Sequence, residues 1–239
     1  MKKATFVLVH GAWHGAWCWH RVVPLLEAAG HRVIAPDLPS MGEDQTPATS
    51  VTLDSWARFV ADIAVQQPDP VVLVGHSRGG IVISRAAELA PERIERLVYL
   101  AAYLLPAGMS LADAARADAN SLVPANMIPA ASGVTCTLRA RVVRDAFYGA
   151  CSDEDCEYAR TRLSPEPLKP LVTPLAVTPE KFGRVPRIYI ECTDDRTISL
   201  AEQRRMHAAL PCERVFTLAT DHSPFLSAPQ ELAGILISI

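Results

Sequence analysis

The sequence of 239 residues predicts an α/β fold built on a mostly parallel, doubly wound sheet. Short apolar runs alternate with segments of helical spacing over most of the chain. The runs are apolar at almost every position, as is typical of strands that are buried on both faces. Because strands alternating with helices build a parallel sheet that is covered on both sides, we expect one such layered unit.

The first elements follow this alternation. The apolar run Thr5–Val9 is the first expected strand. Helical spacing at His20–Ala29 stops at Gly30, and Arg32–Ala35 is the second expected strand. A longer helix is expected at Leu53–Val65, where apolar side chains recur on one side.

The same alternation continues after a turn. Pro70–Val74 is expected to be a strand, Ile81–Leu89 a helix and Leu97–Ala101 a further strand. Beyond residue 186 the chain repeats the pattern twice, and the expected strands and helices are Arg187–Cys192, Leu200–Leu210, Arg214–Leu218 and Pro229–Ile237.

Residues 103–186 interrupt this rhythm. Their clearest helical pieces are Leu111–Ala119 and Asp153–Leu163, and nine prolines stand between Pro106 and Pro186. Because so long a stretch cannot be a plain loop in a compact domain, we interpret it as a helical insertion over the carboxyl edge of the sheet. The sequence thus predicts a core of residues 1–102 and 187–239 and a lid of residues 103–186, although a decorative surface insertion has the same composition.

Composition and charge narrow the class of protein. The chain is 49% hydrophobic and 21% charged, with a formal net charge of −3 at pH 7. This balance gives no attraction for nucleic acid or for an anionic membrane. No apolar stretch approaches the roughly 20 residues of a membrane span. We therefore expect no nucleic-acid or membrane partner.

The start of the chain and the use of cysteine predict a cellular location. The apolar run that follows Met1–Lys3 ends at His10 and is too short for the hydrophobic region of a signal peptide. The residues of this run fit a first strand better. The six cysteines are irregularly scattered, without a Cys-x-x-Cys pair. This usage predicts a cytoplasmic protein with no metal site, and no motif implies a cofactor.

Gly75-His76-Ser77-Arg78-Gly79 is the most informative segment of the chain. A buried strand comes before this Gly-x-Ser-x-Gly pattern and a helix comes directly after it, which is the sequence form of a nucleophile elbow. Ser77 is forced into strained backbone geometry in such a turn, and the glycines leave room for neighbouring elements. The competing interpretation is a glycine-rich turn with an idle serine.

A serine hydroxyl needs a base to become a nucleophile, and the base needs an orienting acid. In elbow folds these residues follow in the chain order serine, acid, histidine. His222 comes just after the last expected strand and is the candidate base. Asp194 and Asp195, just after the preceding strand, both fit the acid, and spacing does not separate them. Asp221 is a weaker third candidate because its side chain diverges from that of its neighbour His222.

The remaining histidines fall into two groups. Near the surface, on helices or at strand entries, we expect His20, His31 and His207. Beside the predicted site, where they can shape it, we expect His10, His14 and His76.

A tetrahedral intermediate also needs hydrogen-bond donors for its oxyanion. One is normally the backbone N–H of the residue after the nucleophile, here Arg78. The other comes from the loop after an early strand, and the turn His10–Gly15 can bring the Ala12 N–H inward.

Several segments together resemble one branch of the α/β-hydrolase family, which contains plant methylesterases, salicylic acid-binding protein, hydroxynitrile lyases and bacterial esterases. They are Phe6–Trp17, Pro24–Val33, the elbow Gly75–Gly80, Thr193-x-Asp195-Arg196 and Asp221-His222. The resemblance covers nearly the whole chain apart from the lid and implies an α/β-hydrolase fold.

The family pattern also assigns roles. Its acid is the aspartate before the basic residue of Thr-x-Asp-Lys/Arg, which selects Asp195, and its oxyanion donors fall at the backbone of Ala12 and Arg78. Two departures bear on activity. Hydroxynitrile lyases carry a threonine and a lysine where this chain has Gly11 and Ser223, which disfavours cyanohydrin cleavage. Arg78 stands where a small or apolar residue is common, and its side chain has to lie along the helix or reach a lid carboxylate.

The resemblance and the motifs predict a serine hydrolase that cleaves small apolar or aromatic carboxylic esters. Ser77 would attack the carbonyl, His222 would relay the proton, Asp195 would orient His222, and water would release the acyl group. Carbamate, amide or carbon–carbon cleavage on the same residues is an alternative, and a small-molecule receptor of the same fold is a second. A homodimer is compatible with the sequence.

Overall fold

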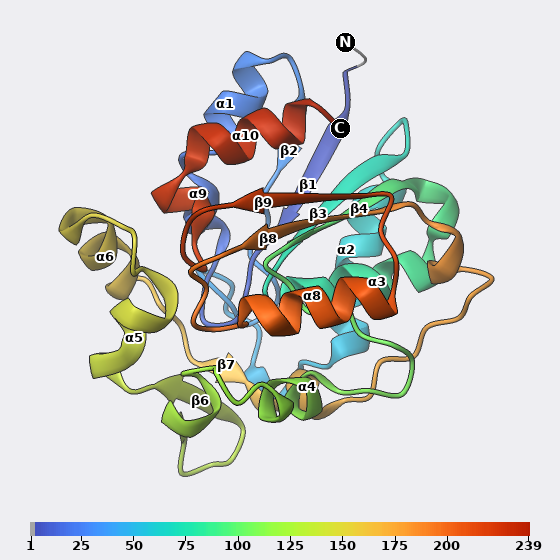
Figure 1. Cartoon of the computed structure of the whole chain (residues 1–239). Coiled ribbons are helices and arrows are strands. Elements are labelled where there is room, and N and C mark those ends of the chain that lie inside the picture. Colours follow the sequence, from blue (N-terminus) through green and yellow to red (C-terminus); the bar gives the residue numbers. More distant parts are fainter. Residues whose placement is uncertain (1–2) are drawn as a thin grey trace.

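The computed structural model describes residues 3–239, so the first two residues of the expected core lie outside the described residues. Six parallel strands form one sheet in the order β2-β1-β3-β4-β8-β9 (Figure 1). The strands are β1 (Thr5–Val9), β2 (Arg32–Ile34), β3 (Val71–His76), β4 (Ile94–Leu100), β8 (Arg187–Cys192) and β9 (Arg214–Leu218). The predicted α/β class is confirmed.

The strand order indicates where on the sheet a ligand would bind. The chain leaves β1 for β2 on one side and crosses back to β3 on the other side of β1. Such a reversal opens a crevice at the carboxyl ends of the strands, where ligands bind in open α/β sheets. Because all six strands are parallel, the loops that follow β1, β3, β8 and β9 leave the sheet at this same edge.

Helices cover both faces of the sheet (Figure 1). One apolar cluster joins Trp56, Ile83 and Met206 to the strands, and the helices that contribute to it are α2 (Leu53–Val65), α3 (Gly79–Leu89) and α8 (Leu200–Ala209). A second cluster joins Leu26 and Leu232 to the opposite face, and its helices are α1 (Val23–Ala28), α9 (Pro224–Ser227) and α10 (Pro229–Ile237). Burial on both faces explains the almost continuous apolar strands.

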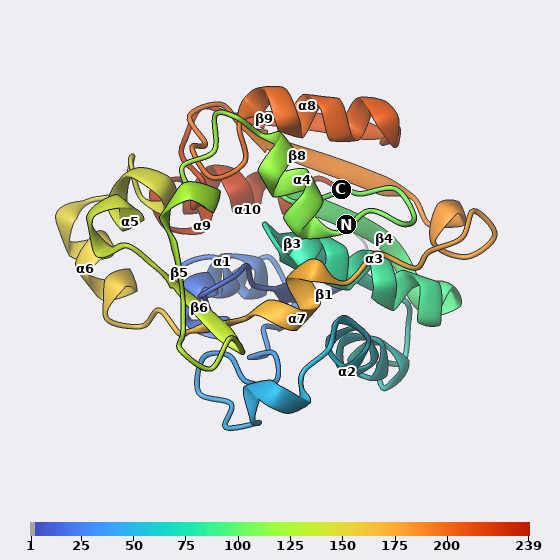
Figure 2. The same ribbon diagram turned by 90° about the horizontal axis from the view of Figure 1, so that it is seen from below.

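The lid segment is more than helical. Its helices are α4 (Leu111–Ala117), α5 (Ala140–Phe147), α6 (Asp153–Arg160) and α7 (Leu168–Val172). It also contains an antiparallel sheet in the order β5-β6-β7, formed by Met127–Pro129, Thr135–Leu138 and Glu166–Pro167. These strands differ from the helical insertion that the sequence predicts, because β7 is two residues long and pairs with a strand some thirty positions earlier. Figure 2 shows the lid elements gathered beside one end of the main sheet.

Element boundaries differ from expectation in places. The helix expected from His20 starts at Val23, because residues 16–19 form a 3-10 turn. Strand β4 begins at Ile94, three residues earlier than expected, and α3 begins at Gly79. Four further 3-10 turns are Ala48–Ser50, Pro91–Arg93, Pro124–Asn126 and Phe182–Arg184. Among residues 3–239, none of the helices has the length and apolar character that crossing a membrane requires.

Candidate active site

Ser77 lies on the tight turn between β3 and α3. Its backbone φ is +52°, in the left-handed region that non-glycine residues rarely occupy. A Cβ at Gly75 would come within 2.8 Å of the Gly79 backbone, and a Cβ at Gly79 within 2.7 Å of the Val9 carbonyl oxygen. Both positions therefore require glycine, and the packing of three elements holds Ser77 in its strained conformation.

The structure brings Asp195 and His222 together. The His222 Nδ1 donates to the Asp195 Oδ2 over 2.7 Å, and both side chains are buried. Asp195 follows β8 and His222 follows β9, and the two strands are neighbours in the sheet. The neighbouring Asp194 is exposed to solvent. The geometry thus separates two aspartates that spacing alone could not.

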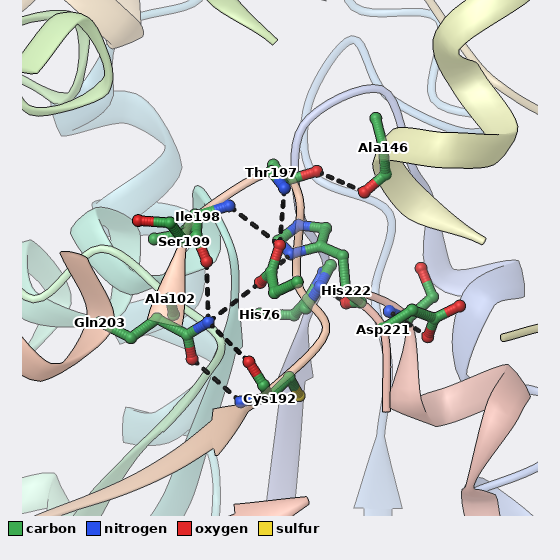
Figure 3. Close-up of polar contacts among 12 residues, drawn as sticks. His76, Ala102, Ala146, Cys192, Thr197, Ile198, Ser199, Gln203, Asp221 and His222 are labelled. Carbon is green, nitrogen blue, oxygen red and sulfur yellow. Dashed lines mark hydrogen bonds and ion pairs between the residues drawn. The ribbon is translucent and has the colours of Figure 1, made fainter. Parts of the chain in front are cut away.

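Asp195 is itself held in one orientation. Its Oδ1 accepts from the backbone N–H groups of Thr197 and Ile198, at 2.7 and 2.9 Å. The buried Gln203 donates to the Asp195 Oδ2 over 3.3 Å and to two backbone carbonyls (Figure 3). Sequence reasoning missed Gln203, because it lies one helical turn into α8 and carries no motif.

His76 supports the other partner. Its Nε2 donates to the backbone carbonyl of His222 over 2.8 Å, and the two rings lie 4.6 Å apart between centroids (Figure 3). Since His76 directly precedes Ser77, this bond ties the loop after β9 to the elbow. His76 shapes the site, as its position in the sequence predicted.

Asp221, the third candidate for the acid, makes contacts other than those of Asp195. Its Oδ2 accepts from the Ala150 N–H over 2.8 Å, and its Oδ1 accepts from the Ser227 hydroxyl over 2.7 Å. The Ala150 contact attaches the lid to the loop that carries His222, and the Ser227 contact ties this loop to α9.

Within residues 3–239, no hydrogen bond joins the Ser77 hydroxyl to the His222 ring. In sites without substrate this bond is often long and shortens only in the complex. Ser77 and His222 are nonetheless connected through one residue, because His76 directly precedes Ser77 and its ring packs against the His222 ring.

The predicted oxyanion donors lie beside Ser77. Ala12, Ser77 and Arg78 line one cavity of about 290 Å³. Neither the Ala12 N–H nor the Arg78 N–H donates to another described residue. Two backbone N–H groups without a described acceptor thus belong to residues that line the cavity beside Ser77, and an oxyanion site needs donors of this kind.

The Arg78 side chain takes the second of the two positions open to it and reaches a lid carboxylate. Its Nε donates to the Glu166 Oε1 over 3.0 Å, and both side chains are almost completely buried. Its Nη2 donates to the Gly11 carbonyl over 2.9 Å, and its guanidinium lies 4.1 Å above the Trp56 ring. Burial raises the pKa of the Glu166 carboxyl, and the Arg78 charge opposes that shift.

Most of the cavity wall is apolar and comes from the lid. The apolar side chains that the lid contributes include Leu111, Ala115, Val123, Met127, Leu168 and Leu171. Because of this apolar wall, the cavity favours an uncharged ligand with apolar groups.

Among residues 3–239 no group of three His, Cys, Asp or Glu side chains is placed to hold a metal ion.

Three histidines around the site are buried: His10, His14 and His76. Burial lowers the pKa of His14 to about 3, and it lowers the pKa values of His10 and His76 well below their usual range. His14 donates to the Ala12 carbonyl through Nδ1 and accepts from the Tyr148 hydroxyl through Nε2, at 2.7 Å each.

These depressed pKa values predict an acid-sensitive fold. Below the usual histidine pKa of about 6.5, the unfolded chain binds protons that the folded protein excludes. Stability is thus full above that pH and falls as the pH decreases toward the folded-state values, by up to ~1.4 kcal/mol per pH unit for each histidine. Urea unfolding should give a lower midpoint at pH 5 than at pH 7.5. A midpoint that does not change down to pH 5 would contradict the prediction.

Comparison with known proteins places this geometry among related chains. The model of the alpha/beta hydrolase family matches residues 6–235. Methylesterase 2 of Arabidopsis thaliana is 33% identical over 255 residues, which cover 100% of this chain and 96% of that protein. Putative methylesterase 11, chloroplastic, from the same plant is 33% identical over 251 residues, and the match spans all of this chain but 64% of that protein.

A solved structure extends the likeness to three dimensions. The crystal structure of a pyrethroid hydrolase from Sphingobium faniae JZ-2 superposes with a TM-score of 0.86 at 29% sequence identity. The match covers 99% of this chain and 97% of that chain. It includes the lid as well as the sheet.

Proposed function

Because the chain belongs to the alpha/beta hydrolase family, we propose that it hydrolyses small carboxylic esters with apolar or aromatic groups. The observation that carries this proposal is the buried hydrogen bond between Asp195 and His222 at the sheet edge where Ser77 lines the cavity. The names of the related methylesterases and of the pyrethroid hydrolase support the same class of reaction.

The residues act in the proposed reaction in a fixed order. Ser77 attacks the ester carbonyl while His222 accepts the proton from its hydroxyl. The negative oxygen of the tetrahedral intermediate accepts hydrogen bonds from the Ala12 and Arg78 N–H groups. His222 then protonates the departing alcohol, which leaves an acyl group on Ser77. A water molecule, deprotonated by His222, attacks this acyl group and releases the acid.

The charge and shape of the cavity support this substrate class. The Arg78 guanidinium is already paired with Glu166, so it does not offer an unpaired charge to a substrate carboxylate. The lid lines the cavity with aliphatic side chains. A neutral ester whose acyl or alcohol group fills this space is therefore the expected substrate.

A series of p-nitrophenyl esters of increasing acyl length tests both the reaction and the cavity. The protein should release p-nitrophenol with saturation kinetics, whereas a receptor would bind without turnover. Replacing Ala115, which lines the cavity on α4, with leucine should lower kcat/KM for the longest accepted acyl group by about 10-fold and leave the acetyl ester within about twofold.

A matched change outside the cavity provides the control. Ala117→Leu alters an exposed position of the same helix and should not change the chain-length preference. The cavity assignment is wrong if both variants keep the wild-type profile. The proposed function is wrong if none of the esters is turned over.

A further inference from the structure

The Ala12 N–H shares a rigid unit with the Gly11 carbonyl, because both belong to one peptide group. A trans peptide is planar, and its N–H and C=O point in opposite directions. Whatever holds the Gly11 oxygen therefore also aims the Ala12 N–H.

Two side chains hold the Gly11 oxygen. The Arg78 Nη2 and the His10 Nδ1 each donate to it over 2.9 Å. A charged donor makes a stronger hydrogen bond than a neutral one. It also polarises the peptide group, so the N–H at the other end becomes a better donor. The Arg78 side chain thus acts on the peptide group that carries the N–H of the cavity-lining residue Ala12.

The following peptide is held at both ends as well. The Glu166 Oε2 accepts from the Trp13 N–H over 2.9 Å, and the His14 Nδ1 donates to the Ala12 carbonyl over 2.7 Å. Trp13 has a φ of +61°, so this turn is held in a strained form by its contacts. One oxygen of Glu166 therefore fixes the loop after β1, and the other fixes Arg78.

We propose that Arg78 and Glu166 are positioning residues for the oxyanion site. Arg78 supplies one donor through its own backbone and aims the second, the Ala12 N–H, through its side chain. Glu166, on the lid strand β7, holds Arg78 and the Ala12 loop in register. The inference rests on the proposed function and adds a role for two residues outside the triad.

Energetics supports a positioning role over a purely stabilising one. A buried ion pair contributes little net stability compared with an apolar pair of similar volume, because both charges lose their hydration. This pair is almost fully buried. It makes two further hydrogen bonds to the loop after β1, at the Gly11 carbonyl and the Trp13 N–H, and the Arg78 guanidinium lies over the Trp56 ring. Because the pair lies beside both proposed donors, such an arrangement has a role in the proposed reaction.

Glu166→Gln is the sharpest test. The amide has one acceptor for two donors, so either Trp13 N–H or Arg78 Nε loses its partner. We expect kcat for a p-nitrophenyl ester to fall on the order of 10²-fold, as for loss of one oxyanion donor, with KM within about threefold. Glu166→Asp retains the charge and should recover part of kcat.

Two further variants make the result decisive. Asp155→Asn disrupts another ion pair between lid and core, with Arg21, without touching the Ala12 loop, and should leave kcat unchanged. The double variant Arg78→Met with Glu166→Gln removes the unpaired buried charge, so it should fold even if Glu166→Gln does not. It should show the same loss of kcat.

The outcomes separate the two proposals. If Glu166→Gln or the folded double variant keeps wild-type kcat and only the unfolding temperature falls, the pair is structural and the inference is wrong. If the wild-type protein turns over no ester and a fluorophosphonate does not label Ser77, the proposed function fails instead.

Discussion

Replacing Ser77 with alanine is expected to lower kcat for a p-nitrophenyl ester by about 10⁶-fold, as is typical when a triad nucleophile is removed. Without the hydroxyl no acyl-enzyme can form, and only the oxyanion donors and the cavity still act on the substrate. The variant should fold at least as well as the wild type, because the substitution removes only the side-chain hydroxyl. Single-turnover and steady-state rates measure the effect.

Ser84→Ala provides a matched control. Ser84 lies on α3, the helix that follows Ser77, is buried and donates to the Gly80 carbonyl, away from the cavity lining. Its replacement should leave kcat within about threefold even if stability falls by about 1 kcal/mol. If Ser77→Ala retains wild-type kcat/KM, Ser77 is not the nucleophile.

Asp195→Asn should have the second largest effect, a loss of about 10⁴-fold in kcat. An asparagine can present its NH2 group to His222 Nδ1, which favours the wrong tautomer of the ring. Asp194→Asn is the natural control, because that side chain is exposed and its backbone N–H donates to Thr220 instead. The pair of variants changes adjacent positions by the same chemical step.

The outcome decides the identity of the acid. A large loss in Asp195→Asn with unchanged kcat in Asp194→Asn would support the assignment. Equal losses would refute it, and a loss confined to Asp194→Asn would reverse it. The unfolding midpoint of each variant distinguishes a catalytic defect from a folding defect.

The sequence predicted the central sheet well because its signals are local. An apolar run before Gly75 and a helical pattern after Gly79 locate the elbow, and the strand ends locate Asp195 and His222 within a few residues. The alpha/beta hydrolase family match agrees with the resemblance read from these motifs. What local spacing could not supply was the choice between Asp194 and Asp195, because one residue beyond a strand end reverses the direction of a side chain.

The lid resisted prediction because its contacts are distant in sequence. Glu166 meets Arg78 across 88 positions and Trp13 across 153, and no periodicity reports such pairs. A two-residue strand has too few positions to show alternation. Gln203 escaped notice for a similar reason, since its partners, Cys192 and Asp195, are placed only by tertiary packing.

The contacts of Asp221 and Glu166 give the lid a mechanical property. Asp221 fastens residue Ala150 to the loop of His222, and Glu166 fastens β7 to the loop after β1. A hinge motion of the whole lid would break both of these hydrogen bonds and leave buried carboxylates without partners. We therefore expect small molecules to enter and leave between the short helices α4 and α7, where Arg116 and Val172 line the cavity and are open to solvent.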